Sequence, residues 1–407
     1  MNPVCEQGVV DLLESAVNSK LENFEVEFHG GNEKGEGFLS EMTFVSLKNK
    51  KTGEDYNLII KMARSNNETG YSKDFMTFSF RSEINCYTKV FPAFLKFQKL
   101  YPEVRTFDNY PKCYATCLEK GFEKFALQNL KTQGYELHPK SKMINQNLYE
   151  QIFKMYGEFH ALSFALKHHQ PEEFSRLTKN LTNNWLKFNE SDYANNIITY
   201  FLGKIREYLE EDGEDKIIEK LEKYRTNFVN IFNESVSCSV SNGLLLHGDC
   251  WSNNLMLNFD SAGEIQHIKM IDFQMSYLGS PVLDLSYSLY SGAGKETLDN
   301  LENLLKLYHN TLSETLIKYG CNPENIYPYK MLKKEWKECF RFGFLCSLLI
   351  WAFKTSTDIS EMPTVSDMMD GINKEKIKSD FGIKFDRNLY KKVTLELIKH
   401  LYENDFL

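Results

Sequence analysis

Short stretches in the first third of the chain alternate between apolar and polar residues, which is the period of a half-buried β-strand. These stretches predict five strands, at Phe24 to Phe28, Phe38 to Leu47, Tyr56 to Met62, near Cys113 to Glu119, and at Phe122 to Leu127. A short amphipathic helix over Asp11 to Phe24 is expected before them, and glycine-containing segments predict turns between them.

A helical period replaces this alternation in the rest of the chain. Phe78 to Val90 predicts a helix that stops before Pro92, because the residue before a proline disfavours helical backbone. Helical spacing then dominates the C-terminal two thirds, as in Leu148 to Leu166. The charged run Lys204 to Arg225, broken at Glu211 to Gly213, predicts helices with a solvated face.

This order of elements predicts an α+β fold with a small β-rich lobe and a large helical lobe, the layout of a bilobal protein-kinase-like fold. The 407 residues exceed what one compact core usually serves, which also favours two lobes. We expect an N-terminal lobe of residues 1–127 and a C-terminal lobe of residues 128–407, joined near Leu127 to Gly134.

The composition is that of an ordinary globular protein, with 42% hydrophobic and 26% charged residues. A net charge of −8 and a pI near 5.7 argue against a nucleic-acid-binding protein, which would carry a basic patch. The longest apolar run, Phe342 to Phe353, has 12 residues; it is too short to span a bilayer and predicts a buried helix. Met1 to Leu13 contains acids and only a short apolar run, so no signal peptide is expected.

The nine cysteines are scattered without the spacing of a disulfide framework. Cys113 and Cys117 lie four residues apart, but no matching pair suggests a zinc site. Reduced thiols and a cytoplasmic protein are the simplest expectation, and the oligomeric state stays open. The 30 Phe and 22 Tyr residues suit a large core or a pocket for a bulky apolar ligand.

The clearest chemical signal is a predicted β-hairpin. Leu255 to Phe259 and Ile265 to Ile271 predict its strands, and Asp260 to Glu264 supplies the turn residues between them. Asn254 and Asp272 lie symmetrically about the turn, so an antiparallel pairing should place them opposite each other at the open end of the hairpin.

Asp249 lies in the loop before the first hairpin strand, and the apolar run Leu244 to Leu246 delivers this loop from the core. Kinase-like phosphotransferases need such a set, because one carboxylate deprotonates the attacking hydroxyl while an Asn and a second Asp hold magnesium on the nucleotide phosphates. We therefore predict Asp249 as the catalytic base, and Asn254 and Asp272 as ligands of Mg²⁺. The alternative is a buried hairpin whose Asp and Asn residues only form turns.

Glycines near the N-terminus fit a nucleotide phosphate. Gly35 and Gly37, with Ser40 beyond them, lie between two predicted strands, where backbone N–H groups can approach phosphate oxygens closely. Two alternatives remain: a plain hairpin turn, and a loop tip formed by Gly30 and Gly31 instead.

Lys61 ends an apolar strand, from which it can reach the α- and β-phosphates of a nucleotide. Glu83 follows 22 residues later and shares one face of a predicted helix with Phe80, Ile84 and Tyr87. An acid on an apolar face needs a partner, and Lys61 is the natural one, as in the kinase lysine–glutamate pair. An ordinary strand-end lysine and a solvent-facing glutamate are the alternatives.

Four other residues near these motifs are assigned supporting or undecided roles. His247 is expected to support the loop from the core and not to carry a proton, and His160 to be a satisfied core residue. Asp284 begins a helix, where its carboxylate either accepts backbone N–H bonds from the catalytic loop or only favours the helix dipole. Trp251 either lines a substrate pocket or packs beneath the loop.

The chain resembles the ecdysteroid kinase-like family, whose choline kinase-like domain is related to the choline and aminoglycoside kinases. The resemblance covers nearly the whole chain and rests chiefly on His247-Gly-Asp-Cys-Trp-Ser-Asn-Asn254, on Ile271-Asp-Phe-Gln274, and on Gly279-Ser-Pro281 with Asp284-Leu285. Matching positions also occur at Lys61, at Phe80, Glu83, Tyr87 and Pro92, and in Phe159-His-Ala-Leu-Ser163.

The resemblance implies ATP- and Mg²⁺-dependent phosphorylation of a hydroxyl on a small molecule, such as an ecdysteroid, another lipophilic alcohol or a xenobiotic. Lys61, Asp249, Asn254 and Asp272 match the family's functional positions. The family's lobe connection usually reads Leu-Glu-Asp-Leu, whereas this chain has Leu127-Gln-Asn-Leu130. Adenine is normally held there by backbone groups, so Gln128 and Leu130 are still expected beside the nucleotide, without an acidic contact to ribose or substrate.

Two rival functions remain. A protein kinase is disfavoured by Gly248 where those enzymes favour Arg, by Gln274 where they favour Gly, and by the absence of a downstream Ala-Pro-Glu motif. A catalytically silent protein that binds a lipophilic ligand or a nucleotide is disfavoured by the intact set of Lys61, Glu83, Asp249, Asn254 and Asp272.

Overall fold

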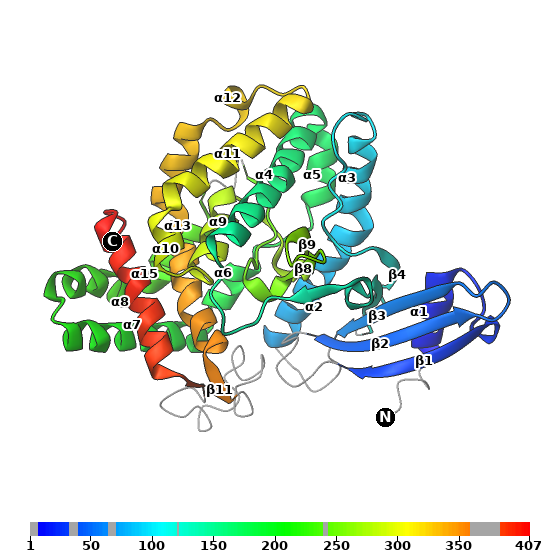
Figure 1. The fold of residues 1–407 in the computed structure, drawn as a ribbon, viewed down its shortest axis with the longest axis horizontal. Coiled ribbons are helices and arrows are strands. Elements are labelled where there is room, and N and C mark those ends of the chain that lie inside the picture. The colour runs from blue at the N-terminus through cyan, green and yellow to red at the C-terminus, as the bar shows by residue number, and fades with distance from the viewer. Residues whose placement is uncertain (1–6, 32–39, 64–70, 120–121, 239–242, 359–382) are drawn as a thin grey trace.

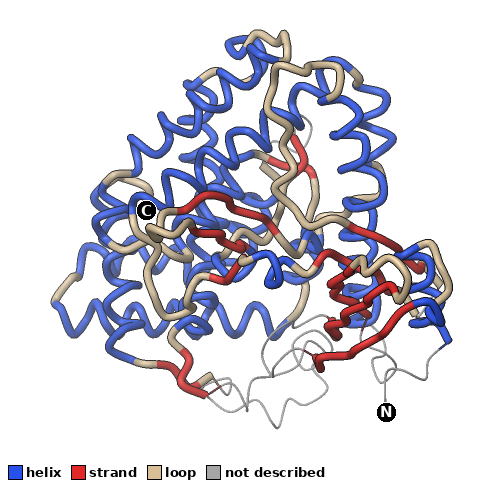
Figure 2. Tube along the Cα trace, turned by 45° about the vertical axis from the view of Figure 1, so that its right-hand side comes forward, coloured by secondary structure: helices blue, strands red, loops and turns tan. Residues whose placement is uncertain are grey.

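The structure is a computed structural model that describes residues 7–31, 40–63, 71–119, 122–238, 243–358 and 383–407 (Figure 1). A β-sheet with one covering helix forms one end of the molecule, and a large group of helices forms the rest (Figures 1 and 2). The predicted α+β bilobal fold is confirmed.

The sheet at the small end has five antiparallel strands in the order β1-β2-β3-β5-β4. Its strands are β1 (Phe24–Gly31), β2 (Ser40–Asn49), β3 (Asp55–Ala63), β4 (Cys113–Cys117) and β5 (Lys124–Gln128), close to the predicted bounds. Apolar residues that alternate along the strands, such as Val45, Leu47, Leu58 and Ile60, form a small core with helix α1.

Helix α1 (Gln7–Val17) lies earlier in the chain than predicted. It ends before Asn18, whose φ of 49° is left-handed, a conformation that commonly terminates helices. A 3₁₀ turn, η2 (Leu21–Asn23), and strand β1 then occupy the rest of the segment for which a helix was expected. The prediction of one helix over Asp11 to Phe24 is therefore wrong in its second half.

The predicted helix end before Pro92 is also wrong. Helix α2 (Tyr71–Asn85) passes through a π-helical turn, η3 (Cys86–Val90), into α3 (Phe91–Gln98). Pro92 lies in the first turn of α3, where a proline is tolerated because that N–H needs no partner within the helix. Side chains of α2 and α3 contribute to the large core of the helical part, as Phe80 and Phe94 do.

The chain leaves the small sheet at the end of β5 and continues into the helical part. After β5 follow the 3₁₀ turn η4 (Leu130–Gln133) and then β6 (Tyr135–Leu137), with Gly134 between them at a φ of 79°. β6 pairs with β8 (Leu255–Phe259), which in turn pairs with β9 (Ile265–Met270).

Long helices surround this second sheet (Figure 1). The mostly buried α4 (Gln146–His169) packs against α11 (Leu301–Lys318), and α9 (Pro281–Tyr290) packs against α13 (Tyr329–Lys354). The remaining elements are α5 (Pro171–Thr178), α6 (Asn184–Asn189), α7 (Asp192–Asp212), α8 (Asp215–Val236), β7 (Leu244–Leu245), η6 (Ser252–Asn254), η7 (Phe273–Met275), β10 (Leu278–Gly279), α10 (Lys295–Asp299), α12 (Pro323–Ile326), β11 (Ser356–Asp358), β12 (Lys384–Phe385) and α15 (Arg387–Glu403).

The predicted break in the charged run is confirmed at Gly213, which separates α7 from α8 at a φ of 73°. Acidic side chains at this turn form ion pairs with basic side chains of α15. Glu211 pairs with Arg387 and Lys391, and Glu214 pairs with Lys399. These ion pairs join the turn to α15, although each exposed pair adds little stability.

Two further features concern the cysteines and the membrane. Cys238 and Cys339 form a disulfide that joins the end of α8 to α13, so the expectation of reduced thiols is wrong for this pair. Their separation of 101 residues leaves no local pattern that sequence analysis can detect. In the described ranges, no helix is long and apolar enough to cross a membrane.

Candidate active site

The predicted hairpin is present as β8 and β9, but its register differs by one residue from the prediction. Asn254 lies opposite Ile271, whose N–H donates to the Asn254 carbonyl oxygen at 3.0 Å. An irregularity between Asn258 and Phe259 offsets the two strands. The expected pairing of Asn254 with Asp272 is therefore wrong, and Asp272 lies one residue beyond the ladder.

Asp272 turns the chain out of β9 and faces Lys61. Its φ of 66° is left-handed, a conformation that Asp and Asn adopt more readily than other residues with a side chain. The carboxylate accepts a hydrogen bond from Lys61 Nζ at 3.0 Å and remains 29% exposed. Asp272 Oδ1 can therefore accept the hydrogen bond from Lys61 while the exposed part of the carboxylate remains accessible to a ligand.

Lys61 on β3 also donates to Glu83 of α2, with Nζ 2.7 Å from Oε2. Both side chains are buried. Burial favours the neutral amine, but the carboxylates of Asp272 and Glu83 outweigh this effect and raise the pKa of Lys61. The lysine therefore stays charged between two acids, and the contact expected between Lys61 and Glu83 is present.

Asp249 lies between two hydrogen-bond donors in the loop before β8. Tyr287 Oη donates to its Oδ1 at 2.9 Å, and Asn254 Nδ2 donates to its Oδ2 at 2.8 Å. Burial, and then the charge of Asp272, raise the pKa of Asp249 to about 7, while the two hydrogen bonds oppose the rise. A carboxylate with such a pKa is suited to accept a proton near neutral pH.

Asp284 fixes the loop that carries Asp249. Its two oxygens accept the backbone N–H groups of His247 at 2.8 Å and of Gly248 at 2.9 Å, and His160 Nε2 lies 3.3 Å from Oδ2. Hydrogen bonds from His160 and from the loop lower the pKa of Asp284 against the effect of burial. The loop contact that the sequence suggested for Asp284 is therefore present, and His160 adds a contact that was not expected.

His247 and Gly248 shape the same loop from inside. His247 is fully buried, and its Nε2 lies 2.9 Å from the carbonyl oxygen of Ile271. Burial lowers its pKa, so it remains neutral. Gly248 has a φ of 84°, and a Cβ there would come within 2.0 Å of the Met275 carbonyl oxygen. Only glycine fits this close approach.

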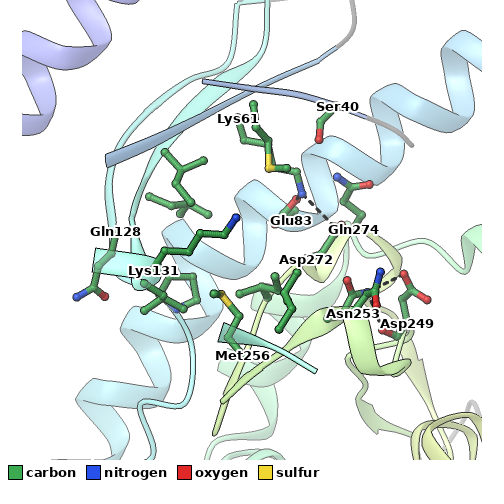
Figure 3. A pocket seen from close by; sticks show the side chains of 18 of the residues that line it. Ser40, Lys61, Glu83, Gln128, Lys131, Asp249, Asn253, Met256, Asp272 and Gln274 are labelled. Atoms are coloured by element: carbon green, nitrogen blue, oxygen red, sulfur yellow. Dashed lines mark hydrogen bonds and ion pairs between the residues drawn. The ribbon is translucent and has the colours of Figure 1, made fainter. Parts of the chain in front are cut away.

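A cleft with about 1300 Å³ of empty space, including the part open to solvent, is lined by Lys61, Glu83, Asp249, Asn254 and Asp272 (Figure 3). It is lined from the small sheet by Ser40, Met42, Phe44, Ile59 and Lys61, from the connection by Leu127, Gln128, Leu130 and Lys131, and from the helical part by Asp249, Trp251, Asn254, Met256 and Asp272, among others. The cleft therefore lies between the two parts of the fold.

The cleft contains donors suited to a nucleotide with a metal ion. The buried hydroxyl of Ser40 has no hydrogen-bond partner among the described residues. The same residues contain no cluster of three His, Cys, Asp or Glu side chains for a metal. Asn254 and Asp272 offer side-chain oxygen atoms to the cleft, and these fit Mg²⁺, which commonly takes one or two protein ligands together with substrate phosphates. Gly35 and Gly37 lie outside the described residues, and Gly30 and Gly31 belong to the end of β1.

The sequence model of the ecdysteroid kinase-like family matches residues 34–321, which is more than half of the chain. The chain belongs to the ecdysteroid kinase-like family. The matched residues include Lys61, Glu83, Asp249, Asn254 and Asp272. Membership supports a kinase-like phosphotransferase in general terms. Among curated proteins, no sequence matches the chain closely enough to count as a relative.

At the connection, the side chains of the two residues that replace the family's usual acids accept hydrogen bonds from backbone N–H groups. The Gln128 side chain is directed away from the cavity in Figure 3, and its Oε1 accepts the N–H of Lys112 at 3.2 Å. Asn129 Oδ1 caps η4 by accepting the N–H of Lys131. The Lys131 side chain, by contrast, points into the cavity (Figure 3).

Restoring the acids with Gln128→Glu and Asn129→Asp should therefore change the KM for ATP by less than about twofold, because the side chain at position 128 is directed away from the cavity and an Asp caps η4 as well as an Asn. Steady-state kinetics on the double variant would measure this. A drop of KM well beyond that range would mean that an acid here does contact the nucleotide.

Sequence reasoning missed two residues that contact the loop. Tyr287 lies three residues after Asp284 on the same face of α9, so helical spacing from the suspected Asp284 was a usable signal. Trp185 Nε1 donates to the Gly248 carbonyl oxygen at 2.8 Å and packs edge-on against Tyr287. No pattern near Trp185 indicated this contact. Trp251 is half-buried and lines the cleft.

Proposed function

We propose that the protein is an ATP-dependent small-molecule O-kinase, which transfers the γ-phosphate of ATP to a hydroxyl of a lipophilic alcohol such as an ecdysteroid or a xenobiotic. The observation that carries this proposal is the position of Lys61, whose Nζ lies 2.7 Å from Glu83 and 3.0 Å from Asp272 in the same cleft as Asp249. A glutamate-tethered lysine beside a metal-binding aspartate is the arrangement with which kinases hold nucleotide phosphates.

In this proposal residues 1–127 form the nucleotide-binding lobe. Lys61 binds the α- and β-phosphates and Glu83 holds it in place. Gly35, Gly37 and the free hydroxyl of Ser40 approach the phosphates, and Leu130 with Gln128 borders the adenine through the backbone. Apolar side chains from different sides of the cleft, such as Ile59, Leu127 and Met256, suit a flat base.

Residues 128–407 form the catalytic and substrate lobe. Asn254 Nδ2 is engaged by Asp249, so its Oδ1 is the atom available to Mg²⁺, together with the exposed part of the Asp272 carboxylate. The bound ion would neutralise charge on the phosphate oxygens. Asp249 orients the acceptor hydroxyl and takes its proton as the phosphoryl group leaves, while Asp284 and His247 keep the loop in shape.

A wall of aromatic side chains beside Asp249 supports an apolar acceptor. Trp185 is half-buried and packs edge-on against Tyr287, Phe342 and Phe188. Tyr287 in turn donates to Asp249. In this proposal a bulky apolar alcohol packs against the half-buried Trp185 and Phe188, in front of the buried Tyr287 and Phe342, with its hydroxyl near the base. A highly charged acceptor would lose hydration there without gaining a partner.

The test is ATP turnover in the presence of Mg²⁺ with a panel of steroids, plant alcohols and polar amino alcohols. The proposal expects turnover that depends on a lipophilic alcohol, with a phosphate ester as product. Tight nucleotide binding without turnover for any acceptor would instead support a silent binding protein. Turnover only with polar amino alcohols would overturn the assignment of the acceptor.

The lysine–glutamate pair makes a separate prediction. Lys61→Met should impair ATP use while leaving the fold intact, because it removes the charge that binds phosphate. Glu83→Gln should act in the same direction but more mildly, since Lys61 keeps Asp272 as a partner. Because the residues are in contact, the loss in the double variant should differ from the sum of the single losses by at least about 0.5 kcal/mol. If the free-energy losses calculated from kcat/KM for the two single variants add up to the loss of the double variant, Lys61 and Glu83 are not coupled.

A further inference from the structure

Lys354 is a buried lysine that lies behind the catalytic loop. It is the last residue of α13, only 3% exposed, and lies beyond the residues matched by the family. Its Nζ contacts Ser252 Oγ at 3.3 Å and the Ser291 carbonyl oxygen at 3.1 Å. Ser252 begins η6, the three-residue turn that ends at Asn254.

Among the described residues, the groups around Lys354 Nζ are polar or aromatic and carry no full negative charge. The ammonium lies 4.6 Å from the ring centroid of Trp351, and Ser291 closes the C-terminus of α9, where a helix favours cations. Trp351 Nε1 itself donates to the neighbouring carbonyl oxygen of Tyr290. None of the ion pairs within the described ranges involves Lys354. His138, whose pKa is lowered first by burial and then by Lys354, is the titratable group nearby.

Such a lysine costs the fold stability. Burial lowers the pKa of Lys354 to about 7. The unfolded chain therefore binds more protons than the folded protein between pH 7 and the ordinary lysine pKa of about 10.4. The reduction in the free energy of unfolding caused by Lys354 is largest at and below pH 7 and becomes smaller as the pH rises. A neutral side chain such as Met fills similar volume without this cost.

Although buried Lys354 lowers the stability of the fold, its position suits a role in supporting the catalytic loop. η6 joins Trp251, which lines the cleft, to Asn254, which donates both to the Asp249 carbonyl oxygen at 2.9 Å and to its carboxylate at 2.8 Å. Lys354 Nζ links Ser252, the first residue of this turn, to Ser291 at the C-terminal end of α9. Releasing Ser252 would therefore loosen Asn254 and the carboxylate that it contacts.

We propose that Lys354 is a positioning residue, which anchors the Ser252–Asn254 turn to the C-terminus of α9 and so holds Asn254 and Asp249 in their working arrangement. This inference rests on the proposed function. Lys354 is not among the residues that line the cleft, and in this inference it acts through Ser252.

The first test is Lys354→Met in the full chain. We expect kcat to fall by about tenfold and the binding of a non-hydrolysable ATP analogue with Mg²⁺ to weaken, as happens when a partner behind a metal ligand is removed. Analogue binding without Mg²⁺ should be unchanged. The melting temperature at pH 7 should stay equal to that of the wild type or rise, and this difference should shrink toward pH 10.

Lys167→Met is the matched control. Lys167 also lies in the last turn of a helix, donates to a backbone carbonyl oxygen, that of Gly243 at 3.0 Å, and approaches the ring of Phe174. Burial lowers its pKa as well, but it does not touch η6. This variant should retain the wild-type kcat and the wild-type binding of the analogue with Mg²⁺.

Ser252→Ala tests the link itself. Alone it should weaken Mg²⁺-dependent binding in the same direction as Lys354→Met, and adding it to Lys354→Met should cause little further loss. Wild-type kinetics in Lys354→Met, or a large drop in its melting temperature at pH 7, would overturn the inference. If no acceptor supports turnover in the wild type, the proposed function fails separately, and Mg²⁺-dependent analogue binding still decides the role of Lys354.

Discussion

Asp249→Asn is expected to leave the binding of ATP with Mg²⁺ nearly normal and to lower kcat by about 100-fold or more, the scale typical of removing a general base. The amide keeps the size of the side chain but loses the charge and nearly all the basicity. Calorimetry of nucleotide binding and a turnover assay on the same variant would separate these two effects.

The contacts of Asp249 indicate that this variant should fold. The two oxygens accept from Tyr287 and Asn254. In the variant the amide N–H₂ group can face Tyr287, because a hydroxyl also accepts hydrogen bonds, while the carbonyl oxygen keeps the contact with Asn254. The loop remains tied to Asp284 through the backbone of His247 and Gly248.

Tyr287→Phe is the companion control for Asp249→Asn. It removes one hydrogen bond to Asp249 but leaves the carboxylate in place, so its loss of kcat should be much smaller. If Asp249→Asn degrades binding and turnover together and lowers the melting temperature, Asp249 has a structural role. Full turnover in Asp249→Asn would remove the central claim of the proposal.

Features that depend on local spacing could be predicted from the sequence. The hairpin strands were expected at Leu255 to Phe259 and Ile265 to Ile271, and β8 and β9 agree within one residue. Lys61 and Glu83 were expected to meet because a buried acid needs a partner, and they do. Both inferences use residues whose spacing along a strand or a helix fixes the direction of the side chain.

Features set by irregular backbone could not be predicted in this way. The hairpin turn is centred about residue 262 and not 263, since Phe259 lies opposite Ile265. The irregularity after Asn258 then shifts the pairing by one residue, and no residue type signals either feature. The π-helical turn before Phe91 carries the helix past the expected stop at Pro92. In both cases one extra residue changes how the following residues align with their neighbours. The pattern of apolar positions predicts the ends of a helix or strand only to within a residue or two, so it cannot detect such a change.

Contacts between distant segments were the other gap. Trp185 reaches the Gly248 carbonyl oxygen and Lys354 reaches Ser252 across 63 and 102 residues. Each contact depends on how α6 and α13 pack against the loop, and packing leaves no periodic signal. Asp284 was an exception, because its position in the first turn of a helix after the hairpin suggested a contact with the catalytic loop. The structure contains that contact.

Asp272→Asn should reduce turnover by about 100-fold or more, since loss of a group that only supports a metal ligand already costs about 10- to 100-fold. A neutral amide replaces the charged oxygen that would bind Mg²⁺, and Lys61 loses one of its two carboxylates. Nucleotide binding in Mg²⁺ should weaken, while binding without Mg²⁺ should change less.

The backbone makes Asp272→Asn an informative substitution, because Asn adopts a left-handed φ of 66° as readily as Asp does. Asp405→Asn is the matched control: Asp405 has a similar φ of 55°, but it lies near the C-terminus and does not line the cleft. Its turnover should equal that of the wild type, which would assign the loss in Asp272→Asn to the missing charge. Turnover of Asp272→Asn equal to the wild type at subsaturating Mg²⁺ would contradict the metal assignment, whichever alcohol accepts the phosphate.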